Sequence, residues 1–160
     1  MTRLRESIEK KKLVFEEALR RESNQKEREK IVRTQVRWLC RNDLFYLGQV
    51  TGHTKFLVPF HRDLCDKVSL MNWQIVKLGI MPLSPGMLKI DEVDDLGDSQ
   101  RLYLLFRSAF KTTIITKLHT AQLLLNFPNI HIAISHNTQI NASDNLESVK
   151  NLFLTTQLKE

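Results

Sequence analysis

The first stretch of the chain is polar, with apolar residues only at wide intervals. Residues 3–33 are rich in Glu, Lys and Arg, and this pattern predicts a long, mostly exposed helix with a break near Ser23 and Asn24. So few apolar side chains can bury little area, and we therefore expect this arm to pack lightly on the rest. The sparse apolar positions include Leu4, Ile8, Phe15 and Leu19.

A denser apolar pattern follows and indicates a second helix. From His61 to Leu78 the apolar residues fall at steps of three and four, which is typical of one buried helix face. Gly79 comes where such a helix would end. The segment 80–88, "IMPLSPGML", contains two prolines and a glycine and is predicted to be a linker, and the acidic patch "DEVDDLGD" comes after it.

The pattern changes in the second half of the chain. "LYLLF", residues 102–106, is a continuous apolar run typical of a buried strand, and "IHIAIS", residues 130–135, alternates like a second one. Helical stripes follow each of them, over 112–125 and 142–153. The order predicts an α/β fold in which a helical N-terminal segment precedes the first half of a parallel sheet. We predict a helical segment at 1–80, a linker at 81–100 and a partial α/β core at 101–160.

The positive charge of the chain is concentrated at its beginning. The net charge is +6, and residues 1–37 hold 12 Lys and Arg against 7 Asp and Glu. A basic arm suggests an acidic partner such as nucleic acid, although a helix that is merely well solvated would show the same composition.

The cysteines and the apolar runs indicate in which part of the cell the protein is expected. Two cysteines cannot form a disulfide framework, and the start of the chain lacks the apolar core of a signal peptide. No apolar run approaches the ~20 residues that span a bilayer. We therefore expect a cytoplasmic protein with no membrane partner.

The segment "RSAFKTT", residues 107–113, has the Lys-Thr-Thr of a phosphate-binding loop. It lies between a predicted strand and a predicted helix, where such a loop must lie, so Lys111 could reach phosphates and Thr112 could ligate Mg²⁺. The full Walker A pattern has glycine at the positions that Leu105 and Phe110 occupy here. The alternative is an ordinary strand–helix connection capped by Ser108, with Lys111 in water.

The wider context is more specific. The string from Leu102 to Phe153 resembles the large subunit of tailed-phage DNA-packaging terminases, in which a variant loop precedes an apolar helix, an Asn-Pro-Asn-like turn and an alternating strand. "RNDLFYLGQVTGHTKFLVPFHRDLCDKV" also looks like the helical lead-in of that family. The resemblance covers roughly residues 38–155.

The resemblance implies roles for several residues. It assigns the loop arginine, which acts at the γ-phosphate during hydrolysis, to Arg107, the phosphate lysine to Lys111, and the hydroxyl beside Mg²⁺ to Thr112. Ser108 and Thr113 complete the loop, with Ser108 in place of the usual glycine, whose lack of a Cβ permits close backbone approach. Further upstream, the resemblance places the adenine pocket near Phe60 or His61, although core packing is the simpler interpretation of these two residues.

The resemblance also implies cofactors and partners. These are ATP and Mg²⁺, double-stranded DNA, a portal protein, a small terminase subunit and further copies of the chain on a procapsid, in a bacterial host cell. After Lys111 the acids are Asp144, Glu147 and Glu160, and none ends an apolar strand, as hydrolysis would require. We therefore expect the front of an ATPase domain that by itself does not hydrolyse ATP.

Two other function classes stay open. One is a non-enzymatic basic helical module that binds nucleic acid or a protein partner. The other is a different P-loop enzyme such as a small kinase, which should contain its own acidic catalytic residues. His61 and Cys65 have a spacing that can hold a metal, but no other His/Cys cluster accompanies them, and a structural role is the simpler interpretation.

Overall fold

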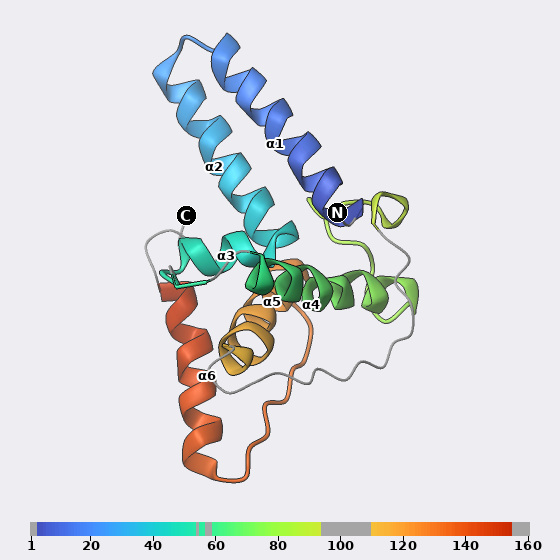
Figure 1. Cartoon of the computed structure of the whole chain (residues 1–160), viewed down its shortest axis with the longest axis vertical. Coiled ribbons are helices and arrows are strands. Elements are labelled where there is room, and N and C mark those ends of the chain that lie inside the picture. Colours follow the sequence, from blue (N-terminus) through green and yellow to red (C-terminus); the bar gives the residue numbers. More distant parts are fainter. Residues whose placement is uncertain (1–2, 54, 57–58, 94–109, 155–160) are drawn as a thin grey trace.

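The computed structural model describes residues 3–53, 55–56, 59–93 and 110–154 (Figure 1). Within these residues the regular elements are helices, and no strand is present. The elements are α1 (Arg3–Arg21), α2 (Gln25–Asn42), α3 (Leu44–Val50), α4 (Phe60–Lys77), the 3₁₀-helix η1 (Ile90–Glu92), the π-helix η2 (Thr112–Leu118), α5 (His119–Asn126) and α6 (Gln139–Leu154).

The predicted α/β fold is wrong. Residues 130–135 are irregular and not paired with a strand, and residues 130–134 line a cavity of about 430 Å³ together with Leu124 of α5 and Val149 of α6. Ile130, Ile132 and Ile134 are half-buried, whereas the residues between them are exposed. Alternating hydrophobicity shows that one side of an extended segment is covered, but it does not show whether a sheet or a helix covers it. Here the cover is helical. The predicted strand at 102–106 lies outside the described residues.

The polar N-terminal stretch forms a helical hairpin that stands out from the other helices (Figure 1). The predicted break is confirmed, because α1 ends at Arg21 and α2 begins at Gln25. Asn24 causes the restart: its side chain accepts a hydrogen bond from the Lys26 amide at 3.0 Å, which satisfies one of the free N–H groups of the new helix. Arg28 reinforces the turn by donating from Nη1 to the carbonyls of Leu19 and Glu22.

The base of the hairpin is not lightly packed, contrary to our expectation. Leu4 and Ile8 are 1% and 0% exposed and belong to the same hydrophobic cluster as Trp73 of α4. Arg5 lies between them, and its guanidinium binds Asp63 and Asp66 of α4. Two well-placed apolar residues in one turn are enough to anchor a helix whose outer part is exposed, so the first turns of α1 are part of the core.

Two hydrophobic clusters form the core, and each joins the front of the chain to its back. The first packs Leu47 of α3 and Val68 of α4 against Ile114 and Leu118 of η2. The second packs the base of α1 and Trp73 against Leu123 of α5. The predicted helix after His61 is confirmed as α4, and its end at Gly79 is also confirmed, since Gly79 has a φ of +70°.

Buried amides connect the helices to the linker. Asn42, which is fully buried at the end of α2, donates to the carbonyls of Trp38 and Gly86 and accepts from the Leu88 amide at 2.8 Å. In the centre of the core, Asn72 of α4 donates to Gln122 of α5, also at 2.8 Å. Buried polar groups need such partners, so these contacts fix the position of the linker and the spacing of α4 and α5.

His119 is the first residue of α5 and a buried titratable group, with 4% of its surface exposed. Burial disfavours the charged imidazolium and lowers the pKa of His119 to about 4. The folded pKa therefore lies below that of the unfolded chain, so folding favours the neutral ring. Its contribution to stability is complete above pH 6.5 and is lost as the pH falls from there towards 4.

We expect acid to weaken the fold through His119. Between pH 7.5 and pH 5 the His119 term should remove about 2 kcal/mol from the free energy of unfolding, since one pKa unit is worth about 1.4 kcal/mol. Urea unfolding of the wild type and of His119→Leu at both pH values measures this term as the difference between their pH dependences. The subtraction cancels the contributions of other groups to the pH dependence. One of these is Asp66, whose raised pKa makes the fold more stable as the pH falls. Equal pH dependences of the two proteins would contradict the prediction.

Candidate functional site

The start of η2 has an unusual backbone. Phe110, the residue before it, has a φ of +52° and is the one non-glycine residue with positive φ in the described part of the chain. Side chains with a Cβ rarely adopt this left-handed conformation. Position 110 is also where the Walker A pattern has glycine, so the backbone takes the conformation that glycine favours although a phenylalanine is present. This strain makes the Phe110–Lys111 step a candidate functional feature.

The residues after Phe110 form the first turn of a helical segment. Lys111 and Thr112 are exposed and Thr113 is half-buried, and no side-chain hydrogen bond caps the helix at Lys111. The segment begins as a π-helix, in which the His119 amide bonds the Ile114 carbonyl, and continues as α5. π-Helical turns are rare and are frequent at functional sites. The start of a helix carries partial positive charge and points N–H groups outward, which suits an anion.

An aromatic cluster joins this helix start to the start of α4. The rings of His61 and Phe110 meet edge to face at 5.4 Å between centroids, and Phe56 stacks on His61 at 5.3 Å. Phe60 also meets the His61 ring edge to face, with the two ring centroids 5.1 Å apart. Residues about 50 positions apart in the sequence are thereby brought together, and Lys111 follows directly on this cluster.

Two members of the aromatic cluster differ sharply in exposure. His61 is 2% exposed, so its ring is enclosed by the neighbouring phenylalanines and serves the core. Phe60, by contrast, is 37% exposed. A planar ligand could therefore reach Phe60 without any rearrangement, whereas it could reach His61 only by displacing a phenylalanine. The core interpretation of His61 is favoured by this geometry.

Part of the predicted site lies outside the described residues. Arg107 and Ser108 belong to that part, so their roles stay predictions. The described members, Lys111, Thr112 and Thr113, lie together at the beginning of η2, with His61 packed behind Phe110. Sequence reasoning missed Phe56 and Phe110 as parts of the site, because ring contacts between distant segments leave no periodic signal.

Comparison of the chain with family models, with curated proteins and with solved structures finds no match. In the part of the chain that the structure describes, no helix combines the length and the apolar character needed to cross a membrane.

The described residues do not form a ready-made metal site. No group of three His, Cys, Asp or Glu side chains gathers among them in a way that could hold an ion. The pair of His61 and Cys65 is buried, and burial raises the pKa of the Cys65 thiol, which keeps it from becoming a thiolate ligand. A Mg²⁺ ion at Thr112 would therefore take most of its oxygen ligands from phosphates and water, as Mg²⁺ commonly does.

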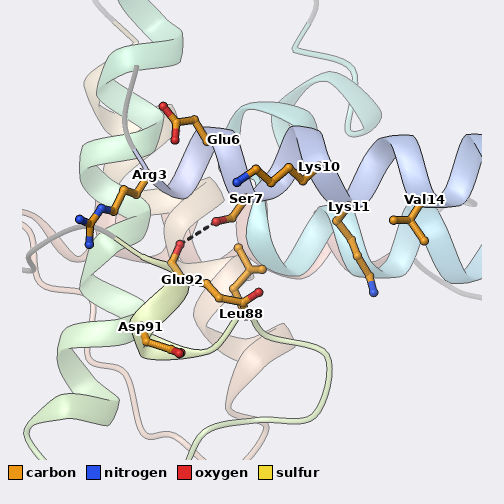
Figure 2. A pocket seen from close by; sticks show the side chains of 9 residues that line it. All are labelled: Arg3, Glu6, Ser7, Lys10, Lys11, Val14, Leu88, Asp91 and Glu92. Carbon is orange, nitrogen blue, oxygen red and sulfur yellow. Dashed lines mark hydrogen bonds between the residues drawn. The ribbon is translucent and has the colours of Figure 1, made fainter.

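A concave surface away from the start of η2 lies between α1 and η1 (Figure 2). Its volume is about 440 Å³, and Ser7 closes one side by donating a hydrogen bond to the Glu92 carbonyl at 2.8 Å. Cations of α1 and acids of η1 face the same space, so this pocket has no preference for one sign of charge. It shares no residue with the start of η2. The lining residues are Arg3, Glu6, Ser7, Lys10, Lys11, Val14, Leu88, Asp91 and Glu92.

Sequence reasoning also missed a buried ion cluster beside the aromatic rings. Arg62 of α4 binds Asp43 at 2.9 Å and Asp66 at 3.3 Å, and its guanidinium lies 5.4 Å from the centre of the Phe45 ring. Asp43 at the same time caps α3 by accepting from the Tyr46 amide. The cluster holds the first turn of α4, and with it Phe60 and His61, against α3. We assign it a structural role in positioning the aromatic residues.

Proposed function

We propose that this chain binds ATP with Mg²⁺ at the start of η2, as part of a DNA-packaging ATPase of the terminase large-subunit type. One observation carries the proposal. The segment assigned to adenine, at Phe60 and His61, packs against Phe110 through the His61 ring, and Phe110 directly precedes Lys111, the residue that we propose binds the phosphates. The resemblance required these two segments to be neighbours, and nothing in their sequence separation makes them so.

In this proposal each residue contacts a different part of the ligand. The Lys111 ammonium would bind the phosphates, and the helix start would add N–H groups and partial positive charge. The Thr112 hydroxyl would complete the ligands of Mg²⁺, which supplies charge neutralisation of the phosphates when it is bound. The exposed Phe60 ring would carry the base, with His61 supporting it from below.

A sheet is not required for this binding step. Phosphate recognition depends on outward N–H groups, a cation and a backbone that lets the ligand approach. The left-handed Phe110 supplies the turn into the helix, and Lys111 and Thr112 at that helix start are exposed. Hydrolysis needs a carboxylate as well, and the described acids after Lys111 are Asp144 and Glu147, both exposed on α6. We therefore propose binding, without turnover by this chain alone.

We expect Lys111→Ala to weaken binding of Mg²⁺–ATP at least 10-fold, because a charge-assisted contact to phosphate is worth about 1.5–3 kcal/mol. Titration of a fluorescent ATP analogue in the presence of Mg²⁺ measures the change. Lys117→Ala is the matched control, since it removes the same charge from the far end of η2, and it should change the affinity less than 2-fold.

Phe60 provides a second arm of this experiment. Phe60→Ala should weaken ATP and adenosine by similar factors, whereas Lys111→Ala should weaken ATP alone. Absence of Mg²⁺–ATP binding to the wild type at millimolar concentration would refute the proposal. So would equal losses in Lys111→Ala and Lys117→Ala, because they would indicate only a general effect of charge.

A further inference from the structure

The basic residues of α2 are arranged on one side of the helix. Lys26, Lys30, Arg33 and Arg37 follow one another at steps of four, three and four, and all of them are exposed. At 100° per residue, these steps keep the side chains within one narrow stripe. The four positions extend over about 16 Å of helix, at 1.5 Å per residue. Arg41 continues the stripe at its lower end, where its guanidinium is held by the Pro85 carbonyl.

The stripe faces away from the rest of the hairpin. The half-buried residues of α2 that turn towards α1, among them Ile31, Gln35 and Trp38, lie on a different side of the helix. Trp38 contacts Phe15 of α1 at 6.1 Å between ring centroids, which marks that side as the hairpin interface. The cationic stripe is thus an outer surface of the projecting arm.

Acidic neighbours neutralise the stripe only in part. Lys30 pairs with Glu27 at 2.7 Å, and both side chains are largely exposed, so the pair is weak and exchangeable. Glu29 is engaged by Gln25 at 3.2 Å. Arg33 has an interaction within the protein that a ligand must replace. Across α2 as a whole, Lys and Arg number six against two Glu, so an excess of positive charge remains on the helix.

We propose that this cationic stripe binds the phosphate backbone of a double-stranded nucleic acid. A straight row of cations without an aromatic residue among them suits regularly spaced phosphates, whereas single strands are held by aromatic rings that stack on bases. A membrane-binding helix would need a broad apolar side next to its cations, and the large apolar residue that α2 exposes is Val32, on another side of the helix. The stripe is separate from the start of η2, so this proposal does not depend on ATP binding.

Fluorescence anisotropy with a 25-base-pair duplex tests the stripe. For four phosphate contacts, the logarithm of the association constant should fall against the logarithm of the salt concentration with a slope of about −3.6. Between 50 and 200 mM salt the affinity should therefore fall about 100-fold. The combined variant K26Q/K30Q/R33Q/R37Q should lose at least 10-fold in affinity at 50 mM salt, and its slope should approach zero.

The matched control removes four charges from α1. The variant K10Q/K11Q/R20Q/R21Q loses two lysines and two arginines, as the stripe variant does, and should lose less than 3-fold. Circular dichroism establishes that both variants are folded. Equal losses in the two variants would overturn the proposal, because net charge alone would then explain binding. Tighter binding of poly-glutamate or of phosphatidylserine vesicles than of the duplex would also overturn it.

Discussion

Trp73→Ala is expected to lower the free energy of unfolding by about 3–5 kcal/mol. Trp73 is 0% exposed and lies in the cluster that joins α1, α4 and α5, so truncation would leave a large cavity that rigid helices cannot close. Its indole Nε1 also donates to the Leu88 carbonyl at 2.9 Å and so fixes the linker. Domains of this size are commonly stable by only 5–15 kcal/mol, so the variant should be near its unfolding threshold. Urea denaturation followed by circular dichroism measures the loss.

Trp73→Phe separates packing from the hydrogen bond. It keeps most of the apolar volume and leaves the Leu88 carbonyl without its donor, and we expect a cost of about 1–3 kcal/mol. If Trp73→Ala cost less than 1 kcal/mol, Trp73 would not be the centre of a packed cluster.

Arg62→Met is expected to cost about 3–5 kcal/mol, because removal of one partner leaves the buried carboxylates poorly compensated. The side chain of Arg62 is 12% exposed, whereas those of Asp43 and Asp66 are 0% and 5% exposed. Arg5 would still hold Asp66 through close contacts, whereas Asp43 would keep the more distant Lys12 ammonium at 3.8 Å, so the larger part of the loss should arise at Asp43. The same urea titration gives the value.

A double variant tests this assignment. Adding Asp43→Asn to Arg62→Met removes the poorly compensated charge and should restore about 1–2 kcal/mol, on the scale by which a desolvated charge is penalised. Asp43→Asn alone keeps an oxygen for the cap of α3 and shows what that substitution costs by itself. Strict additivity of the two substitutions would contradict a coupled ion cluster.

The sequence predicted the helices well wherever an apolar stripe was long. The break at Asn24, the helix after His61 and its end at Gly79 all appear in the structure, because caps, periodicity and glycine act locally. The stripe over residues 112–125 also became a helix, although its first part is π-helical. Hydrogen-bond spacing of that kind depends on how the side chains pack, and no local pattern encodes it.

The errors have a common physical cause. The apolar alternation at 130–135 predicted a strand, and the sparse apolar residues of α1 predicted a loosely attached arm. Each pattern shows how much apolar surface a segment offers, but the partner of that surface is decided by the tertiary fold. Ile132 packs towards the second core cluster, and Leu4 with Ile8 completes that same cluster. Likewise, a sequence motif was enough to single out Lys111 as a candidate site residue. Only the fold shows that Phe110, the residue before it, packs in the aromatic cluster.

The two buried cysteines make opening of the hydrophobic core measurable. Cys40 and Cys65 are 2% and 0% exposed in the first hydrophobic cluster, and burial raises the pKa of Cys40 to about 12. Thiol reagents attack the thiolate, so neither sulfur reacts while the cluster is closed. The rate of alkylation in native buffer therefore measures how often the first hydrophobic cluster opens enough to expose a cysteine. The wild-type chain thus needs no engineered label for this measurement. A ligand that stabilises the packing of the helices would lower the rate of alkylation.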